Sequence, residues 1–140
     1  GAGSFFGKSY ATFGPIGPCI VTKDEIKDPQ ALAIKLWVNG QLRHDYNTDD
    51  MEHPIPEIIE FTTSVTPLLT GDIIACGTNH QGLGPLQDGD TGTISISEIG
   101  EFSFGVSDPY KRNWKKEVDE IAAERVRKGE SPLANQYPSK

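Results

Sequence analysis

The chain has 140 residues, and its 20 Asp and Glu against 13 Lys and Arg give a formal net charge of −7. This length predicts one domain, and the acidic balance argues against nucleic acid or an anionic membrane as partner, because both select basic patches. No apolar run is long enough to span a bilayer, and no signal-like stretch opens these residues.

The first segment, residues 5–18, places one lysine among aromatic residues and then runs into two Gly-Pro turns. Lys8 is surrounded in sequence by Phe5, Phe6, Tyr10 and Phe13. Aromatic cover would keep water from the ammonium group and strengthen its effect on a bound anion. The alternative is a solvated lysine at the edge of an aromatic core. A phosphate-binding loop does not fit Gly7-Lys8-Ser9, since no strand precedes it and prolines prevent the helix that should follow.

The next segments predict short strands. Residues 18–22 are apolar and strand-like, and residues 31–38 alternate, with every second residue apolar on one face. Asn39-Gly40 follows directly and predicts a hairpin turn, because both residues tolerate positive φ. Residues 41–45 are then expected to return as the second hairpin strand.

A helical spacing of isoleucines over 55–65 predicts a helix, which Pro67 ends. The near-continuous apolar run at 72–76 predicts a central strand, and a glycine-rich loop follows to residue 90. Residues 91–97 and 101–107 predict a final hairpin that turns at Ile99-Gly100. Cys19 and Cys76 both fall in expected apolar strands, so we predict reduced core thiols and a cytoplasmic protein.

The last part of the chain differs in composition. Residues 113–128 are highly charged and predict a helix that stops at Gly129. Its apolar face would consist of Trp114, Val118, Ile121 and Ala122. We therefore expect a main unit over 1–112 and a charged helical tail over 113–140.

One cluster of side chains and one loop histidine suggest binding chemistry, and each has an alternative interpretation. Histidines and acids gather in the cluster His44, Asp45, Asp49, Asp50, Glu52 and His53. Metal ligands must converge on one point, whereas neighbouring strand residues face opposite ways, so a solvated loop is the favoured interpretation. His80, in the glycine-rich loop, is either a binding residue or a structural one.

Gly77-Thr78 directly follows the expected strand 72–76. The hydroxyl and backbone N–H of Thr78 suit a carboxylate, and the alternative is a threonine that merely ends a strand. Signatures of a serine or cysteine nucleophile are absent from the sequence.

Five motifs follow one another in order: 7–18, 36–43, Asn47-Thr48 with Met51, 71–78, and Asp88-Gly89-Asp90 with Glu98-Ile99-Gly100. Together they resemble the C-terminal half of the fumarylacetoacetate hydrolase family over residues 3–107. The resemblance implies a mainly β fold with one or two helices, a mixed β-sandwich roll that is usually dimeric. It also implies magnesium or manganese and an enolate stabilised by the metal and a lysine.

Within this resemblance, Lys8 matches the family's active-site lysine. Thr78 matches the threonine that holds the substrate carboxylate, and Gly77 and Tyr10 are expected as further substrate-binding residues. Asn79 stands where the family has a proline, a departure that would alter the loop and the choice of substrate.

The family's metal ligands are two glutamates one residue apart and a later aspartate, all before the lysine segment, and its catalytic His and Glu lie on an N-terminal lid. This chain begins at Gly1 and contains no Glu-x-Glu, so we expect no metal ligand within it. The ligands would come from the N-terminal half of the same enzyme or from a second subunit. The alternative is a stand-alone domain without catalysis.

The predicted function is metal-dependent hydrolysis of a carbon–carbon bond in a small 2,4-dioxo acid, such as an acylpyruvate or a fumarylacetoacetate-like compound from aromatic catabolism. Isomerisation or decarboxylation of a 2-oxo acid at the same site is the nearest alternative, because both share the enolate. A non-catalytic β-domain that binds a small acid or a partner is the other. A homo-oligomer is expected, since a divided sheet exposes strand edges and apolar faces.

Overall fold

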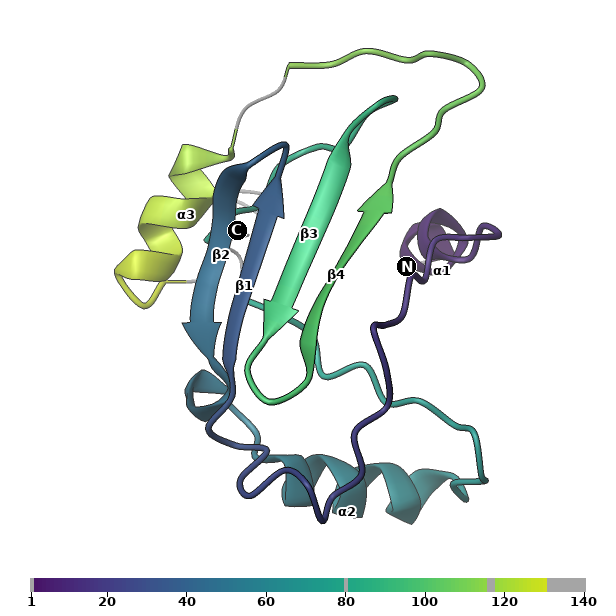
Figure 1. The fold of residues 1–140 in the computed structure, drawn as a ribbon, viewed down its shortest axis with the longest axis vertical. Coiled ribbons are helices and arrows are strands. Elements are labelled where there is room, and N and C mark those ends of the chain that lie inside the picture. Colours follow the sequence, from purple (N-terminus) through teal and green to yellow (C-terminus); the bar gives the residue numbers. More distant parts are fainter. Residues whose placement is uncertain (1, 80, 116–117, 131–140) are drawn as a thin grey trace, which may run out of the picture.

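A four-stranded antiparallel sheet forms the centre of the molecule in the computed structural model, which describes residues 2–79, 81–115 and 118–130. The strand order is β2-β1-β3-β4 (Figure 1). The strands are β1 (Ala33–Val38), β2 (Gln41–Asn47), β3 (Thr91–Ile96) and β4 (Gly100–Gly105). The mainly β class predicted from the sequence is confirmed.

Three α-helices lie around the sheet, where the sequence predicted one or two. They are α1 (Ala2–Lys8), α2 (Ile55–Val65) and α3 (Glu120–Arg127), with a 3₁₀ helix, η1 (Thr48–Asp50), after β2. Figure 1 shows α1 beyond β4, at the opposite edge of the sheet from β2, while α2 crosses one end of the sheet. The bounds of α2 match the predicted helix, and α1 is the additional one.

The predicted hairpin between β1 and β2 is confirmed. Asn39 and Gly40 have φ of 50° and 79°, and Val38 pairs with Gln41 across the turn. The Asn39 side chain also ties this turn to the start of β3: its amide donates to Asp90 (2.8 Å) and its carbonyl accepts from Thr91 N (2.9 Å). Two turns at the same end of the sheet therefore share hydrogen bonds.

The strands expected at 18–22 and 72–76 are not formed in the part of the chain described. Ile20 is 91% exposed and Ile73 is 72% exposed. An apolar run becomes a strand only where a neighbouring strand accepts its backbone hydrogen bonds, and these segments have none within the described residues. The prediction of core thiols is wrong for the same reason, since Cys19 and Cys76 are free and exposed.

The tail helix is shorter than predicted, and it turns a different face inward. Ala122 and Ala123 are buried, whereas Ile121 is 72% exposed. Asp119 caps the helix by accepting from Ala122 N (3.0 Å), and its own N–H donates to Leu83 O (2.7 Å). Trp114 lies outside α3, and its indole N–H donates to Leu86 O (3.1 Å). These bonds hold the tail on the 83–87 segment.

Large apolar side chains are widely exposed. Helix α2 has no buried residue, so the isoleucine stripe that predicted it faces no core among the described residues. The buried apolar residues in the described chain are Leu32, Val38, Ala122 and Ala123. None of the described helices is both long and apolar enough to cross a membrane. Exposed apolar surface of this kind is typical of interaction sites.

A charged network fastens the segment after β4 to the turn before β3. Asp108 accepts from Arg112 Nε (2.8 Å) and from two backbone N–H groups. Its own N–H donates to Asp88, which also pairs with Lys111 Nζ at 2.6 Å. The Arg112 guanidinium lowers the pKa of Asp108 from 3.8 to about 2.

We predict that Asp108→Asn lowers stability and flattens its acid dependence. Because the pKa of Asp108 in the folded chain is depressed to about 2, its carboxylate stabilises the fold above pH 4 and loses that effect as pH falls through 2. Urea unfolding at pH 6 should show a lower midpoint for the variant, and the fall in stability between pH 4 and pH 2 should be smaller. Glu101→Gln, an exposed position on β4, serves as control. Parallel acid profiles for Asp108→Asn and the parent would contradict the assignment.

Candidate functional site

Residues 77–79 and 81–82, here called the Thr78 loop, lie along β2 and are attached to it at three successive points. The Thr78 hydroxyl donates to the Tyr46 hydroxyl at 2.9 Å. The Asn79 side chain bonds to the ring of His44 at 3.0 Å, and Gly82 packs on the backbone of Arg43. As the loop runs forward, its partners run backward along β2. The loop therefore follows β2 antiparallel, held mainly by side chains.

The Asn79–His44 bond fixes which ring nitrogen carries the hydrogen. Asn79 Oδ1 accepts from Gln81 N (3.3 Å), so this atom is the acceptor toward His44 as well. His44 Nδ1 is therefore the donor. His44 is 8% exposed, and a buried donor without an acceptor is costly. Asn79 thus satisfies a buried group that a proline at the same position would leave unpaired.

Gly82 is required by close approach rather than by its backbone angle. A Cβ at residue 82 would overlap the carbonyl group of Arg43, which is backbone and has no rotamer to change. Arg43 itself is buried, and its Nε has no hydrogen-bond partner among the described residues. The contact leaves no space between loop and strand at this point.

The bonded pair of Thr78 and Tyr46 lines a hollow of about 470 Å³, which is also lined by Gly77, so two of the predicted substrate-binding residues, Gly77 and Thr78, lie in it. Gly77 has φ of 80°, so the turn into the loop favours glycine. Tyr46 lies in the same wall and is half-buried. The other lining residues come from β1, from the end of β2 through α2, and from the loop: Ile34, Asn47, Thr48, Asp50, Met51, Glu52, His53, Ile58, Cys76 and Asn79.

The chemistry of this hollow suits a small polar molecule with an apolar part. Hydroxyl groups, two amides and the carboxylates of Asp50 and Glu52 line it together with Ile34, Met51 and Ile58. Convergent polar groups in a largely apolar hollow are the usual features of a small-molecule site.

The other two predicted site residues, Lys8 and Tyr10, lie elsewhere. Lys8 ends α1 and is exposed, and Tyr10 is 66% exposed. Helix α1 lies beyond β4, whereas the hollow adjoins β2 (Figure 1). The structure therefore joins Gly77 and Thr78 but does not bring Lys8 and Tyr10 to them. The aromatic neighbours of Lys8 are themselves exposed, so they do not shield it within this chain.

The histidine and acid cluster is dispersed in the structure. His44 is engaged by Asn79, Asp45 pairs with Lys35 (3.2 Å), and His53 bonds to Glu57 (3.2 Å). Among the described residues, no three His, Cys, Asp or Glu side chains are arranged to hold a metal ion. His80 lies outside the described residues.

Sequence analysis did not identify Tyr46 as a site residue, and it did not identify His44 as the hydrogen-bond partner of Asn79. The available signal was the spacing of His44 and Tyr46, which places both side chains on one face of β2. Their rings are 6.1 Å apart in an edge-on arrangement. Only the folded structure reveals that Thr78 and Asn79 lie against these two side chains.

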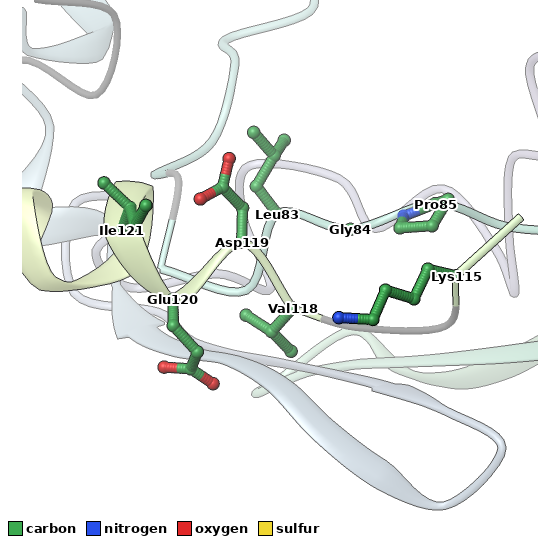
Figure 2. A pocket seen from close by; sticks show the side chains of 8 residues that line it. All are labelled: Leu83, Gly84, Pro85, Lys115, Val118, Asp119, Glu120 and Ile121. Atoms are coloured by element: carbon green, nitrogen blue, oxygen red, sulfur yellow. The ribbon is translucent and has the colours of Figure 1, made fainter. Parts of the chain in front are cut away.

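A second hollow, of about 570 Å³, lies between the 83–85 segment and the start of the tail helix. Figure 2 shows that its walls are Leu83, Pro85, Val118 and Ile121, with Lys115, Asp119 and Glu120 around them. None of the predicted site residues lines it. The hollow beside Thr78 is therefore the candidate functional site.

Comparison with known proteins places residues 1–107 in the fumarylacetoacetate (FAA) hydrolase C-terminal domain. The chain is 38% identical over 101 residues to the maleylpyruvate hydrolase of Aquipseudomonas alcaligenes, covering 72% of this chain and 35% of the relative. It is 41% identical over 105 residues to the oxaloacetate tautomerase of Bacillus subtilis, covering 71% and 35%.

The fold is similar to that of solved structures of the same kind. The crystal structure of maleylpyruvate hydrolase from Sphingobium sp. SYK-6, in complex with manganese(II) ion and pyruvate, matches with a TM-score of 0.70 and 46% identity. The match covers 73% of this chain and 38% of that one. The chain spans 35–42% of the length of three curated relatives that it matches. The expected C-terminal fold type is confirmed.

We predict that Gly82→Ala destabilises the chain by about 3 kcal/mol or more, because the added methyl group meets rigid backbone. Gly105→Ala is the matched control, since a Cβ at residue 105 meets nothing within 4 Å. Urea denaturation measures the free energy of unfolding of both variants. Equal stabilities for the two would show that the loop does not pack on β2 as described.

Proposed function

The chain belongs to the fumarylacetoacetate hydrolase family, and from this premise we propose that it forms the C-terminal part of a hydrolase acting on a small 2,4-dioxo acid such as an acylpyruvate. The observation that supports this most is the hollow lined by Gly77, Thr78 and Tyr46. Its hydroxyl groups suit the carboxylate of a 2-oxo acid. The similar Sphingobium enzyme was crystallised with pyruvate.

In the proposed reaction, water adds to the carbonyl at C4 of the dioxo acid. The C3–C4 bond then breaks, its electron pair passes to C3, and the enolate of a 2-oxo acid leaves. A proton at C3 completes one product, and the C4 fragment leaves as a carboxylic acid. The 77–78 segment binds and orients the carboxylate.

Lys8 is proposed to stabilise the enolate oxygen, as a positive charge placed where negative charge develops. The structure places Lys8 at the end of α1, which lies beyond the β4 edge of the sheet, away from the hollow at β2. This role therefore requires the complete protein to bring the α1 segment, with Tyr10, to the hollow.

A divalent cation, magnesium or manganese, is the proposed cofactor. It would polarise the 2-oxo acid and add charge stabilisation to the enolate. The described residues do not fit a metal centre by themselves, because they contain no converging group of three ligand side chains. We propose that the ligands come from polypeptide outside this chain, and we derive no step through the metal.

Tautomerisation or isomerisation of a 2-oxo acid is the second candidate. The 41% identity to a bacterial oxaloacetate tautomerase favours it. Both reactions need the same carboxylate site and the same enolate, and they differ in whether water attacks a second carbonyl. An acylpyruvate and oxaloacetate, offered to the complete protein, distinguish them by their products.

The complete active unit is proposed to contain more polypeptide than these residues. The relatives are longer, and exposed apolar side chains on α1 and α2, such as Phe5, Phe61 and Val65, need cover. We propose the N-terminal part of the same enzyme or a second subunit, in a homo-oligomer.

The free Cys19 and Cys76 agree with a cytoplasmic location. The family match over 1–107 supports a boundary between 1–112 and the tail at 113–140.

Replacing Lys8 by Met in the complete protein should lower the turnover of an acylpyruvate by about two orders of magnitude, because one positive charge is lost from the enolate. Lys23→Met, at an exposed lysine in a turn, is the matched control. Steady-state kinetics measure both. Unchanged turnover in the Lys8 variant would remove Lys8 from the mechanism.

Removal of divalent metal by a chelator should abolish turnover, and added Mn²⁺ or Mg²⁺ should restore it. The chelated protein should keep its secondary structure by circular dichroism, since no described residues form a metal centre. Full activity after exhaustive chelation would contradict the proposed cofactor.

A further inference from the structure

The hydroxyl pair in the hollow has only one hydrogen to offer a ligand. Thr78 Oγ1 donates its single hydroxyl hydrogen to Tyr46 Oη at 2.9 Å. The Tyr46 hydroxyl keeps its own hydrogen, and among the described residues it has no acceptor for it. The free donor of the pair is therefore the tyrosine.

Chemistry favours this direction when an anion is bound. A phenol is more acidic than an aliphatic alcohol and is the better donor to a carboxylate. A hydroxyl that accepts a hydrogen bond also donates a stronger one, because the bonds polarise each other. Two hydrogen bonds in series, from Thr78 to Tyr46 and from Tyr46 to a carboxylate, use both effects.

The charges around the hollow make this donor important. None of the described residues that line it is Lys or Arg, and Asp50 and Glu52 lie on its wall. The local field within this chain thus opposes an anion. Direct donors must then supply the attraction, and a hydrogen bond to a charged group is about twice as strong as a neutral one.

We propose that the Tyr46 hydroxyl donates directly to the carboxylate of a bound 2-oxo acid, and that the Thr78 hydroxyl acts through it as a positioning group, while the backbone N–H of Thr78 faces the same carboxylate. The inference rests on the proposed function, because it takes the hollow as the carboxylate site. Tyr46 is held for this role by its place on β2, and the bond between Asn79 and the ring of His44 keeps the neighbouring Thr78 in reach.

The test is calorimetric binding of pyruvate, and of its neutral amide, to the complete protein at fixed Mn²⁺ concentration. Tyr46→Phe should weaken pyruvate binding about tenfold or more and reduce the preference for pyruvate over the amide. Thr78→Val should show a smaller loss, and Thr78→Ser should bind like the parent. Tyr110→Phe, at an 80% exposed tyrosine, is the control and should change nothing.

The inference is overturned if Tyr46→Phe binds pyruvate within twofold of the parent, or if Thr78→Val loses more than Tyr46→Phe. It is also overturned if the variant weakens pyruvate and the amide equally, which a purely structural role would produce. Hydrolysis of an acylpyruvate by the parent protein is assayed separately. Absent hydrolysis with Tyr46-dependent pyruvate binding would reject the proposed reaction alone, and no pyruvate binding by the parent would reject both.

Discussion

The attachment of the Thr78 loop (residues 77–79 and 81–82) to β2 is the constraint on which the candidate site depends. Gly82 lies against the backbone of Arg43, Asn79 bonds to the buried His44, and Thr78 bonds to Tyr46. The strand 72–76 that would otherwise carry this loop is not formed in the described chain. These residues are therefore positioned by packing and by two side-chain bonds, one of which, between Thr78 and Tyr46, lies in the wall of the hollow.

The arrangement separates two parts of the proposed chemistry. The proposed carboxylate site consists of the 77–78 segment and Tyr46, at the β2 edge of the sheet. Charge stabilisation by Lys8 belongs to α1, beyond the β4 edge. The apolar side chains exposed on α1 and α2 show where additional polypeptide would cover this chain. On this account, the same additional polypeptide covers those faces and brings Lys8 to the hollow.

Much of the fold could be predicted from the sequence because its signals are local. Asn39-Gly40 tolerates positive φ and defines the β1–β2 turn, and the isoleucine spacing defines α2. The prediction of strands at 18–22 and 72–76 was wrong, because an apolar run does not reveal whether a partner strand is present. Gly77 and Thr78 were found through family resemblance, while Tyr46 and Asn79 were not, because their roles depend on a contact between residues more than thirty positions apart.

The most direct test is a crystal structure of the complete protein with Mn²⁺ and pyruvate bound. The account predicts the pyruvate carboxylate in the hollow beside Thr78, within hydrogen-bond distance of the Tyr46 hydroxyl, with Thr78, Asn79 and Gly82 against β2 as described. Pyruvate bound elsewhere, for example in the hollow between Leu83 and Ile121, or a loop detached from β2, would contradict it.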